Sequence, residues 1–303
     1  MTKKSYFHRT AKQIEEYFDS LPVRAFTNTD LAAILSNNRK DWEIPNNLNA
    51  SKFIEFLETD SYLSRIELLC EAYSNLSRYV WKEPTIYSVA SSIKRNSYFS
   101  HGSALDLHGI SPANGNEIYV NYEQSAKSQS GGKLIQENVD RAFSGTPRQS
   151  RLVYVLGDKN ITVVNGKFTS RLGVESVYDS KGCIISVTNF ERTLIDIAVR
   201  PVYAGGVESV LSAYKKLRGQ ISIDELIRYL EQINYLYPYH QAIGFYMEKA
   251  DYPQNQLRKL RDIGFEIDFY LDYGIENNKE YDSKWRIYYP ANLTKDFASI
   301  KSA

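Results

Sequence analysis

Two things are scarce in this sequence: cysteine and net charge. Of the 303 residues only Cys70 and Cys183 are cysteine, and they stand far apart without a Cys-x-x-Cys pair. Such residues are typical of small buried side chains in a reducing compartment, and they exclude a disulfide framework or a thiolate zinc site. Lysine and arginine number 37 against 36 aspartate and glutamate, a net charge of +1. This balance excludes a basic tail or an acidic arm, so a DNA-binding protein of this charge must gather its cations on one face.

Long apolar runs are also missing. No stretch approaches the roughly 18 apolar residues that a membrane-spanning helix needs, and the amino terminus holds no apolar run of the kind found in a signal peptide. We therefore expect a cytoplasmic protein without membrane contact. The length of 303 residues suits two domains. Tyrosine is abundant, with 24 residues, and we interpret these rings as half-buried packing positions rather than as stacking partners for nucleotide bases.

The first hundred residues show the pattern helix, helix, helix, hairpin. Capping boxes at Thr10 and Thr27 precede two apolar stripes of helical spacing, and a third helix is predicted from about Asn49. Residues 65–68 and 78–81 have the pattern of two paired strands. Three short helices followed by a two-stranded hairpin are the layout of a winged helix-turn-helix, whose third helix enters the major groove of DNA.

The remaining two thirds of the chain mix helices and strands without a β-α-β rhythm. We expect helices at 103–108, 133–143, 192–199, 206–217, 222–233, 239–250 and 254–263. We expect strands at 117–122, 152–156, 161–164 and 183–187, and a final antiparallel pair formed by 265–273 and 285–289. The prediction is an α+β protein, with an N-terminal winged helix-turn-helix domain over residues 1–96 and a mixed α/β domain over residues 97–303. The seam between the two lies in the polar segment near Ser91–Ser100.

Five phrases of the second domain match a known pattern. They are Tyr98–Ile110 (YFSHGSALDLHGI), Ile118–Asn121 (IYVN), Val187–Asp196 (VTNFERTLID), Tyr237–Tyr246 (YPYHQAIGFY) and Phe269–Leu271 (FYL). By their order and spacing the chain resembles the AbiEi-type antitoxins and their wider family of winged-helix proteins. The resemblance covers nearly the whole chain and is strongest over residues 97–290. Two departures are the long polar segment 124–132 and the first hundred residues, which follow the family only in layout.

The resemblance implies both a function and partners. AbiEi-type antitoxins belong to type IV toxin–antitoxin systems, which act in abortive infection as a defence against phage. It implies that this protein binds double-stranded DNA at promoter inverted repeats, as a homodimer on the DNA, and so represses its own operon. It also implies that the C-terminal antitoxin domain neutralises a co-encoded nucleotidyltransferase-like toxin. Whether neutralisation requires direct contact is left open.

The candidate DNA-binding residues lie in the turn before the third helix, at its start, and on the hairpin. Residues at the start of such a helix reach base edges, amides suit adenine, and cations suit phosphate or guanine. The predicted contacts are Arg39, Lys40, Asn46, Asn47, Asn49, Ser51 and Lys52, with Arg65, Arg78 and Lys82 on the hairpin. The alternative is a solvated turn capped by Asn49. Glu55 and Glu58 put negative charge on the same helix, so we expect a modest affinity or a need for a dimer.

No constellation of residues in the sequence predicts catalysis. His101 and His108 fall on one face of a predicted helix, but no further ligands complete a zinc site. The two Asp-Ser-Lys segments at 179–181 and 282–284 are similar to a metal-nuclease motif, yet both lie in turn-like sequence rather than on a strand. We therefore expect a protein that is not an enzyme and uses no cofactor and no metal. The alternatives are a hidden metal-dependent nuclease and a protein-interaction module that has lost DNA binding.

A further group of polar residues is interpreted as structural. A capping box of Thr188 with Glu191 is predicted to open the helix over residues 192–199. Arg192 and Asp196 are four residues apart on this helix, and the spacing pairs their charges on one face. The residues predicted to support the core of the antitoxin domain are His101, Glu191, Arg192, Asp196 and His240.

Overall fold

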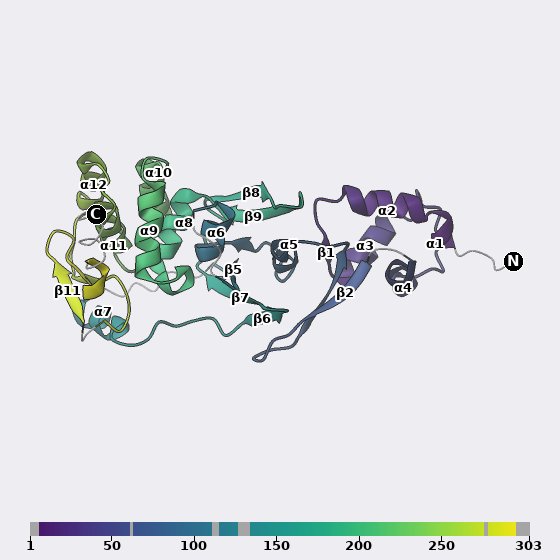
Figure 1. The fold of residues 1–303 in the computed structure, drawn as a ribbon, viewed down its shortest axis with the longest axis horizontal. Coiled ribbons are helices and arrows are strands. Elements are labelled where there is room, and N and C mark those ends of the chain that lie inside the picture. Colours follow the sequence, from purple (N-terminus) through teal and green to yellow (C-terminus); the bar gives the residue numbers. More distant parts are fainter. Residues whose placement is uncertain (1–5, 61–62, 111–114, 127–133, 276–277, 295–303) are drawn as a thin grey trace, which may run out of the picture. The chain divides into compact units, whose positions relative to one another are not determined.

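The computed structural model describes residues 6–60, 63–110, 115–126, 134–275 and 278–294, and these form an α+β protein (Figure 1). The chain divides into two compact units. The first unit contains Met1–Ser97, Leu152–Ile161 and Ser176–Ser186. The second unit contains Tyr98–Arg151, Thr162–Glu175 and Val187–Ala303. The leading segment of the first unit ends beside the expected boundary, but two later segments of the chain also join that unit.

Short helices and a small antiparallel sheet make up the leading segment of the first unit. The helices are α1 (Tyr6–Arg9), α2 (Ala11–Ser20), α3 (Asn28–Asn38), α4 (Ala50–Asp60) and α5 (Ile86–Ser91). The strands are β1 (Ala25–Phe26), β2 (Leu63–Leu68) and β3 (Leu76–Trp81). They have the order β1-β3-β2, and both pairings are antiparallel.

Local hydrogen bonds explain where two of these helices begin. At α3 the expected capping box is present, because the Thr27 side chain accepts a hydrogen bond from the Asp30 amide and Asp30 Oδ2 accepts one from the Thr27 amide at 2.8 Å. At α2 the expected capping box is absent, because the Thr10 hydroxyl turns back toward the carbonyls of Tyr6 and Phe7. Spacing alone predicted both boxes, and only one formed.

Aromatic rings fill the core beneath these helices. Phe18 of α2 stacks on Trp81 of β3 with ring centroids 4.7 Å apart, and Phe53 of α4 lies 6.5 Å from Phe18. All three rings are fully buried. The Trp81 indole donates a hydrogen bond to Asp19 at 2.8 Å, so its polar edge also has a partner. This cluster fixes α2, α4 and the hairpin relative to one another within the unit.

A six-stranded sheet has the order β6-β7-β5-β4-β9-β8. Its strands are β4 (Tyr98–Phe99), β5 (Glu117–Glu123), β6 (Val153–Leu156), β7 (Lys159–Gly166), β8 (Val174–Tyr178) and β9 (Ile184–Thr188). Strand β4 pairs antiparallel with β5 and parallel with β9. The helices of the second unit are α6 (His101–Leu107), α7 (Gln136–Phe143), α8 (Phe190–Val199), α9 (Val207–Leu217), α10 (Ile223–Ile233), α11 (Tyr239–Lys249) and α12 (Gln254–Arg261), with 3-10 turns at Pro201–Ala204 and Ala291–Thr294. The expected polar segment 124–132 and the predicted start of α7 at residue 133 lie largely outside the described residues.

Helix α8 is the central helix of the second unit. It packs against α6, α9, α10 and α11, and every residue from Arg192 to Ala198 is buried (Figure 1). Its first turn is capped by Asn189, whose side chain accepts a hydrogen bond from the Arg192 amide at 3.0 Å. The sequence predicted Thr188 as this cap, but Thr188 instead bonds Thr193 through its hydroxyl at 2.8 Å.

The strands near the end of the chain correct one expectation. Strands β10 (Phe269–Tyr270), β11 (Lys279–Asp282) and β12 (Ile287–Pro290) have the order β10-β12-β11. The predicted antiparallel pairing of 265–273 with 285–289 is wrong, because β10 and β12 run parallel. A tight turn joins β11 directly to β12, and Asp282 Oδ1 accepts hydrogen bonds from the amides of Lys284 and Trp285 in it. A tight turn makes its two strands antiparallel neighbours, so β12 has β11 as its antiparallel partner.

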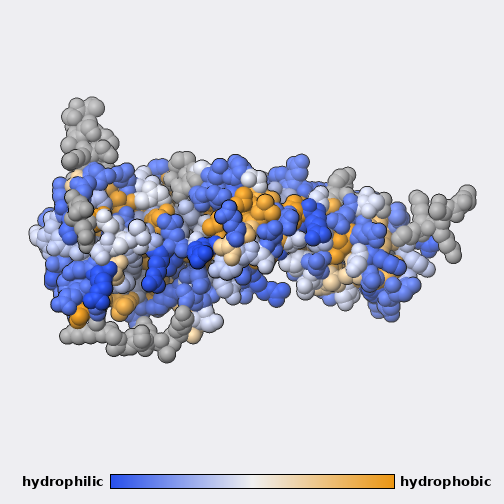
Figure 2. Space-filling model, turned by 90° about the horizontal axis from the view of Figure 1, so that it is seen from below, coloured by the Kyte–Doolittle hydropathy of each residue, from blue (hydrophilic) through white to orange (hydrophobic). Residues whose placement is uncertain are grey.

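The surface carries scattered apolar side chains on a mostly hydrophilic face (Figure 2). The exposed ones include Leu69 and Tyr73 beside the β2–β3 turn, and Leu236 and Ile263 in the second unit. No helix within the described ranges is both long and apolar enough to span a membrane.

Gly244 provides a sharp test of packing in the second unit. It lies in α11 where a Cβ atom would stand 2.0 Å from Cζ3 of the fully buried Trp285. We predict that Gly244→Ala lowers the free energy of unfolding by about 1–3 kcal/mol or more, the range typical of an overpacked core. Gly145→Ala is the control, because nothing lies within 4 Å of the Cβ it would add. Urea denaturation of both variants measures the difference, and equal stabilities would contradict the packing described here.

Candidate functional site

Most of the predicted DNA contacts before and at the start of α4 are exposed. Lys40, Asn46, Asn47, Asn49, Ser51 and Lys52 all present their side chains to solvent. Asn49 also caps α4, since its Oδ1 accepts a hydrogen bond from the Lys52 amide at 3.0 Å. The alternative of a turn capped by Asn49 therefore describes this residue correctly. The other five side chains leave the turn and the first turn of α4 polar and accessible.

Arg39 has a different place from the one expected. It is half-buried, and its guanidinium donates hydrogen bonds to the carbonyls of Pro45 at 2.5 Å and Leu48 at 2.8 Å. These bonds fold the segment between α3 and α4 back on itself. Arg39 therefore stabilises the turn that carries the exposed polar residues between α3 and α4. Its own guanidinium donors point into the protein.

Arg78 corrects the prediction for the hairpin. It was expected on the surface, but only 7% of it is exposed. Its guanidinium donates hydrogen bonds to the carbonyls of Ser77, Ser92 and Ile93 at 2.8 to 3.2 Å. Burial lowers the pKa of this guanidinium, which still stays charged at neutral pH. The four residues from Arg78 to Trp81 are all buried, so both faces of β3 are covered here and alternation along the strand does not bring Arg78 to the surface.

The two remaining hairpin cations are exposed but not equivalent. Arg65 donates a hydrogen bond to the Ser77 hydroxyl across the strands at 3.1 Å. Lys82 forms an ion pair with Asp19 at 2.6 Å. The hydrogen bonds from Lys82 and Trp81 lower the pKa of the Asp19 carboxyl, despite a smaller opposing effect of burial. Part of the Lys82 charge is thus compensated within the unit.

Helix α4 also exposes negative charge. Glu55 and Glu58 are exposed and follow Ser51 at spacings of four and seven residues, so the three side chains share one helix face. The cationic character of this surface is therefore confined to the turn and the amino end of α4.

In the second unit, Arg192 lies at the centre of a buried polar network. Its Nε donates a hydrogen bond to Asp196 Oδ1 at 2.8 Å, and both side chains are less than a tenth exposed. Its Nη1 donates to Thr169 Oγ1 at 3.0 Å and to the Leu172 carbonyl at 2.8 Å. Burial is the largest effect and acts to lower the pKa of the guanidinium, but the charge and hydrogen bond of Asp196, together with Tyr98 and Tyr235, raise it overall. The arginine is therefore permanently charged and surrounded by acceptors.

Glu123 completes this network from strand β5. Its carboxylate accepts hydrogen bonds from the Tyr98 hydroxyl at 3.0 Å, from the Thr169 amide and hydroxyl, and from the Arg171 amide at 3.1 Å. Burial acts to raise the pKa of Glu123, but the bonds from Thr169, Tyr98 and Arg171 hold it below its ordinary value. The sequence analysis missed Glu123, Tyr98 and Thr169, because no spacing in the sequence connects strands β4 and β5 to α8.

The other three residues of the predicted structural group are bonded within the second unit. Glu191 Oε1 accepts a hydrogen bond from the Ser222 amide at 2.8 Å. His101 bonds the Ser100 hydroxyl at 2.7 Å, and burial lowers the pKa of its imidazole to about 4, so the ring is neutral at neutral pH. His240 bonds the Gly264 carbonyl at 2.8 Å, and burial also lowers the pKa of its ring.

Both Asp-Ser-Lys segments use their aspartates to hold turns. Asp179 Oδ1 accepts hydrogen bonds from the amides of Lys181 and Cys183 at 2.9 Å, and Asp282 acts similarly before β12. Within the part of the chain that the structure describes, no three His, Cys, Asp or Glu side chains gather as a metal site requires.

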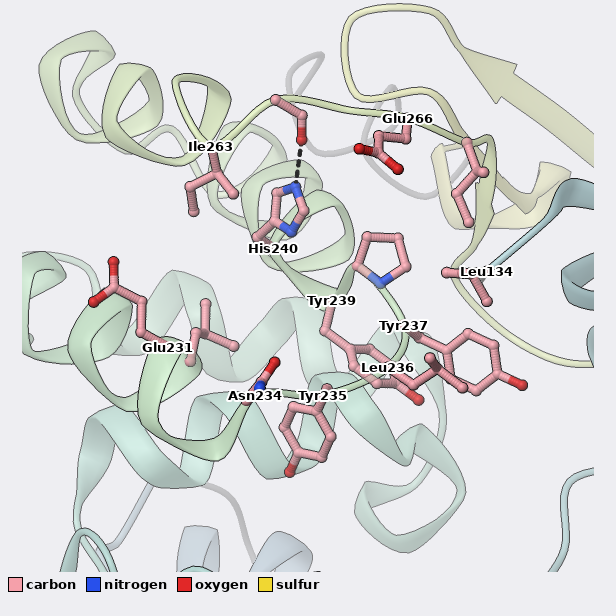
Figure 3. A pocket seen from close by; sticks show the side chains of 14 residues that line it. Leu134, Glu231, Asn234, Tyr235, Leu236, Tyr237, Tyr239, His240, Ile263 and Glu266 are labelled. Atoms are coloured by element: carbon pink, nitrogen blue, oxygen red, sulfur yellow. Dashed lines mark hydrogen bonds between the residues drawn. The ribbon is translucent and has the colours of Figure 1, made fainter. Parts of the chain in front are cut away.

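A groove of about 390 Å³ lies in the second unit near the ends of α10 and α12 (Figure 3). Leu236 and Ile263 lie on opposite sides of it and are 62% and 48% exposed. Glu231 and Glu266 line its rim, and His240 stands between them. Apolar side chains with two carboxylates suit contact with an apolar side chain next to a cation.

Comparison with known proteins bears on the fold. No protein-family model matches the sequence, and no curated protein matches it. The crystal structure of the RV2827C protein from Mycobacterium tuberculosis is similar, with a TM-score of 0.56 at 10% sequence identity. The match covers 97% of this chain and 94% of that chain. The two chains thus share an overall fold across nearly their whole lengths.

The buried network predicts a large loss of stability when Arg192 is truncated. Arg192→Ala leaves Asp196 buried without its partner, and we expect the free energy of unfolding to fall by about 3–5 kcal/mol. The control is Arg228→Ala, which removes an exposed i, i+3 pair with Glu225 and should leave the free energy of unfolding nearly unchanged, because water screens an exposed pair. Thermal and urea unfolding of both variants provide the measurement. A normal melting curve for Arg192→Ala would contradict the structural role.

Glu123 predicts a dependence of stability on pH. Its pKa is lower in the folded protein than in the unfolded chain, so its contribution is fully present above the unfolded pKa of about 4.3 and is lost as the pH falls through the folded value. We expect Glu123→Gln to be less stable than the wild type near neutral pH, with the difference shrinking on acidification below about pH 4.3. Glu231→Gln, at an exposed carboxylate, should follow the wild type throughout. A gap between Glu123→Gln and wild type that is constant across this range would refute the assignment.

Proposed function

We propose that this protein is a DNA-binding repressor of its own promoter and the antitoxin of a type IV toxin–antitoxin pair. The observation that carries the proposal is the element order α2-β1-α3-α4-β2-β3 with the sheet order β1-β3-β2. This order is that of a winged helix-turn-helix, in which α4 is the recognition helix and the β2–β3 hairpin is the wing.

The accessible polar side chains support the placement of DNA at the amino end of α4. Lys40 and Lys52 supply cations for phosphate, while Asn46, Asn47 and Ser51 can hydrogen-bond base edges. Arg65 provides a cation on the wing. Arg39, Arg78 and Lys82 have internal partners and act through the shape of the domain.

The acidic face of α4 limits the affinity of one copy. Glu55 and Glu58 repel phosphate, and few cations remain uncompensated near α4. Two copies on an inverted repeat double the number of phosphate contacts, which supports the expectation of a homodimer on DNA. The same acidic face favours the second candidate function, a winged-helix module that binds a protein instead of DNA.

The antitoxin half of the proposal assigns neutralisation of a nucleotidyltransferase-like toxin to the second unit. Its support is the resemblance to AbiEi-type antitoxins, whose matching phrases fall on core elements of this unit. Tyr98 and Arg192 of the matching phrases belong to the buried network, and Tyr237–Tyr246 includes most of α11. In this proposal the residues of those phrases maintain the fold, and the toxin binds the surface that the folded unit forms.

Paired charge changes on α4 test DNA binding against protein binding. We predict that Lys52→Gln weakens binding to the promoter of the protein's own gene and lowers the salt slope by about one unit, because one phosphate contact is lost. Glu55→Gln should strengthen binding, because it removes repulsion from the same helix. Lys12→Gln on α2, where the lysine side chain is 89% exposed, is the control for loss of one positive charge. Gel-shift titrations at several salt concentrations measure all four proteins.

Three outcomes would count against the repressor. These are no binding of the intact chain to the promoter, equal losses in Lys52→Gln and Lys12→Gln, or weaker binding in Glu55→Gln. The first of these together with capture of a protein partner would favour the second candidate.

A further inference from the structure

Arg200, at the carboxyl end of α8, lies beside three separate hollows of the second unit. The hollows have volumes of about 410, 250 and 80 Å³, and Arg200 lines each of them. Within the described ranges its guanidinium makes no ion pair and is 5.9 Å from the ring of Tyr203. This contrasts with Arg192 on the same helix, whose donors are bonded to acceptors. An uncompensated guanidinium facing solvent-filled space is suited to an anionic ligand.

A second guanidinium and two aromatic rings share the largest of these hollows. Arg148 also lines this hollow, and among the described residues it forms no ion pair with a carboxylate. Tyr237 and Tyr273 line the hollow as well. Burial raises the pKa of the Tyr273 hydroxyl, and the charges of Arg200 and Arg148 act against this rise, so both charges lie near that side chain. Asp272 also lines the hollow, but its Oδ1 accepts a hydrogen bond from the Tyr273 amide at 2.8 Å, and burial raises its pKa. The hollow thus combines two cations with flat apolar surfaces.

The two smaller hollows extend this positive region. Lys167 lines both of them together with Arg200, and its Nζ donates a hydrogen bond to the Asn234 carbonyl at 2.6 Å. Asn121 lines the smallest hollow and is 4% exposed, and its Nδ2 has no hydrogen-bond partner among the described residues. Asp196 also lines the smallest hollow, but its carboxylate is paired with Arg192 at 2.8 Å.

We propose that the hollow between Arg148 and Arg200 is a binding site for a nucleotide. The two guanidinium groups bind its phosphate, in the forked geometry that arginine offers to phosphate oxygens. The base lies against the rings of Tyr237 and Tyr273, since ring contacts accept any base. A volume of about 410 Å³ falls within the range of small-molecule sites. Lys167 shares the two smaller hollows with Arg200 and supplies a further cation for a di- or triphosphate. The site is formed by the second unit and does not depend on DNA binding by the first.

Calorimetric titration of the full chain tests the proposal with three probes: ADP, inorganic phosphate and adenosine. ADP should bind most tightly, phosphate weakly and adenosine most weakly, because the guanidinium groups supply most of the affinity. Arg200→Gln and Arg148→Gln should each weaken ADP binding about 10- to 100-fold, as expected for loss of one charged hydrogen-bonding group. Arg141→Gln, at an exposed arginine of α7 that lines none of the hollows, should bind ADP as the wild type does. Melting temperatures establish that each variant is folded.

Several results would overturn the nucleotide site. One is no heat of ADP binding to the wild type at millimolar concentration. Another is equal affinity for adenosine and ADP, and a third is an equal loss in Arg141→Gln and Arg148→Gln. In a fourth result, ADP binds no more tightly than free phosphate, and duplex DNA displaces it from the wild type but not from Arg200→Gln. This result would assign these cations to DNA instead. If Arg200→Gln is poorly folded, the Arg148→Gln result decides, because Arg148 is exposed.

Discussion

The second unit depends on one buried charge, the guanidinium of Arg192. Taking a guanidinium out of water costs several kcal/mol, and the cost is offset only if its donors find acceptors in fixed positions. Here those acceptors come from α8 itself, through Asp196, and from the segment that follows β7, through Thr169 and the Leu172 carbonyl. Glu123 of β5 fixes the same segment by accepting hydrogen bonds from Thr169 and Arg171. The network therefore specifies how helix, sheet and connecting segment meet.

The position of α8 in turn determines what lies at its carboxyl end. Arg192 and Arg200 belong to one helix and its cap, but their surroundings are opposite in kind. Arg192 is buried among acceptors, whereas Arg200 faces hollows lined by Arg148 and Lys167. A charge that is fully compensated inside a protein stabilises one fold, and a charge that is left without a counter-ion beside a cavity is available to a ligand. Helix α8 and its cap thus carry one structural arginine, Arg192, and one candidate ligand-binding arginine, Arg200.

The features that the sequence predicted correctly rely on short-range geometry. The capping box at Thr27, the β2–β3 hairpin and the i, i+4 pairing of Arg192 with Asp196 each involve residues close in the chain. The hydrophobic periods also placed most helices of the second unit, because a wide apolar stripe repeats over several turns in α9 and α10.

Long-range contacts explain what the sequence could not predict. The direction of β10 depends on β11, a strand that no pattern in the sequence indicated. The inward orientation of Arg78 depends on carbonyls at the end of α5, and the bonds of Arg39 depend on the path of a turn. Asn189 replaced Thr188 as a cap by a shift of one residue, which spacing rules do not resolve. The hollows around Arg200 bring together residues from 148 to 273, a combination that only the folded chain creates.

The distribution of compensated and uncompensated cations also bears on how a nearly neutral protein can bind DNA. In the first unit Arg39, Arg78 and Lys82 are bonded internally, which leaves Lys40, Lys52 and Arg65 as the uncompensated cations of the proposed DNA-binding surface on the turn, α4 and the β2–β3 hairpin. About three phosphate contacts per copy correspond to a salt slope of only about −3, and nonspecific binding that depends on so few contacts is weak. The proposed repressor therefore cannot rely on charge to remain on DNA. Its occupancy of a promoter has to come from base contacts by Asn46, Asn47 and Ser51, multiplied by the pairing of two copies on an inverted repeat. Weak nonspecific binding has a benefit in this arrangement, because a protein that leaves unrelated DNA quickly is free to find its own operator.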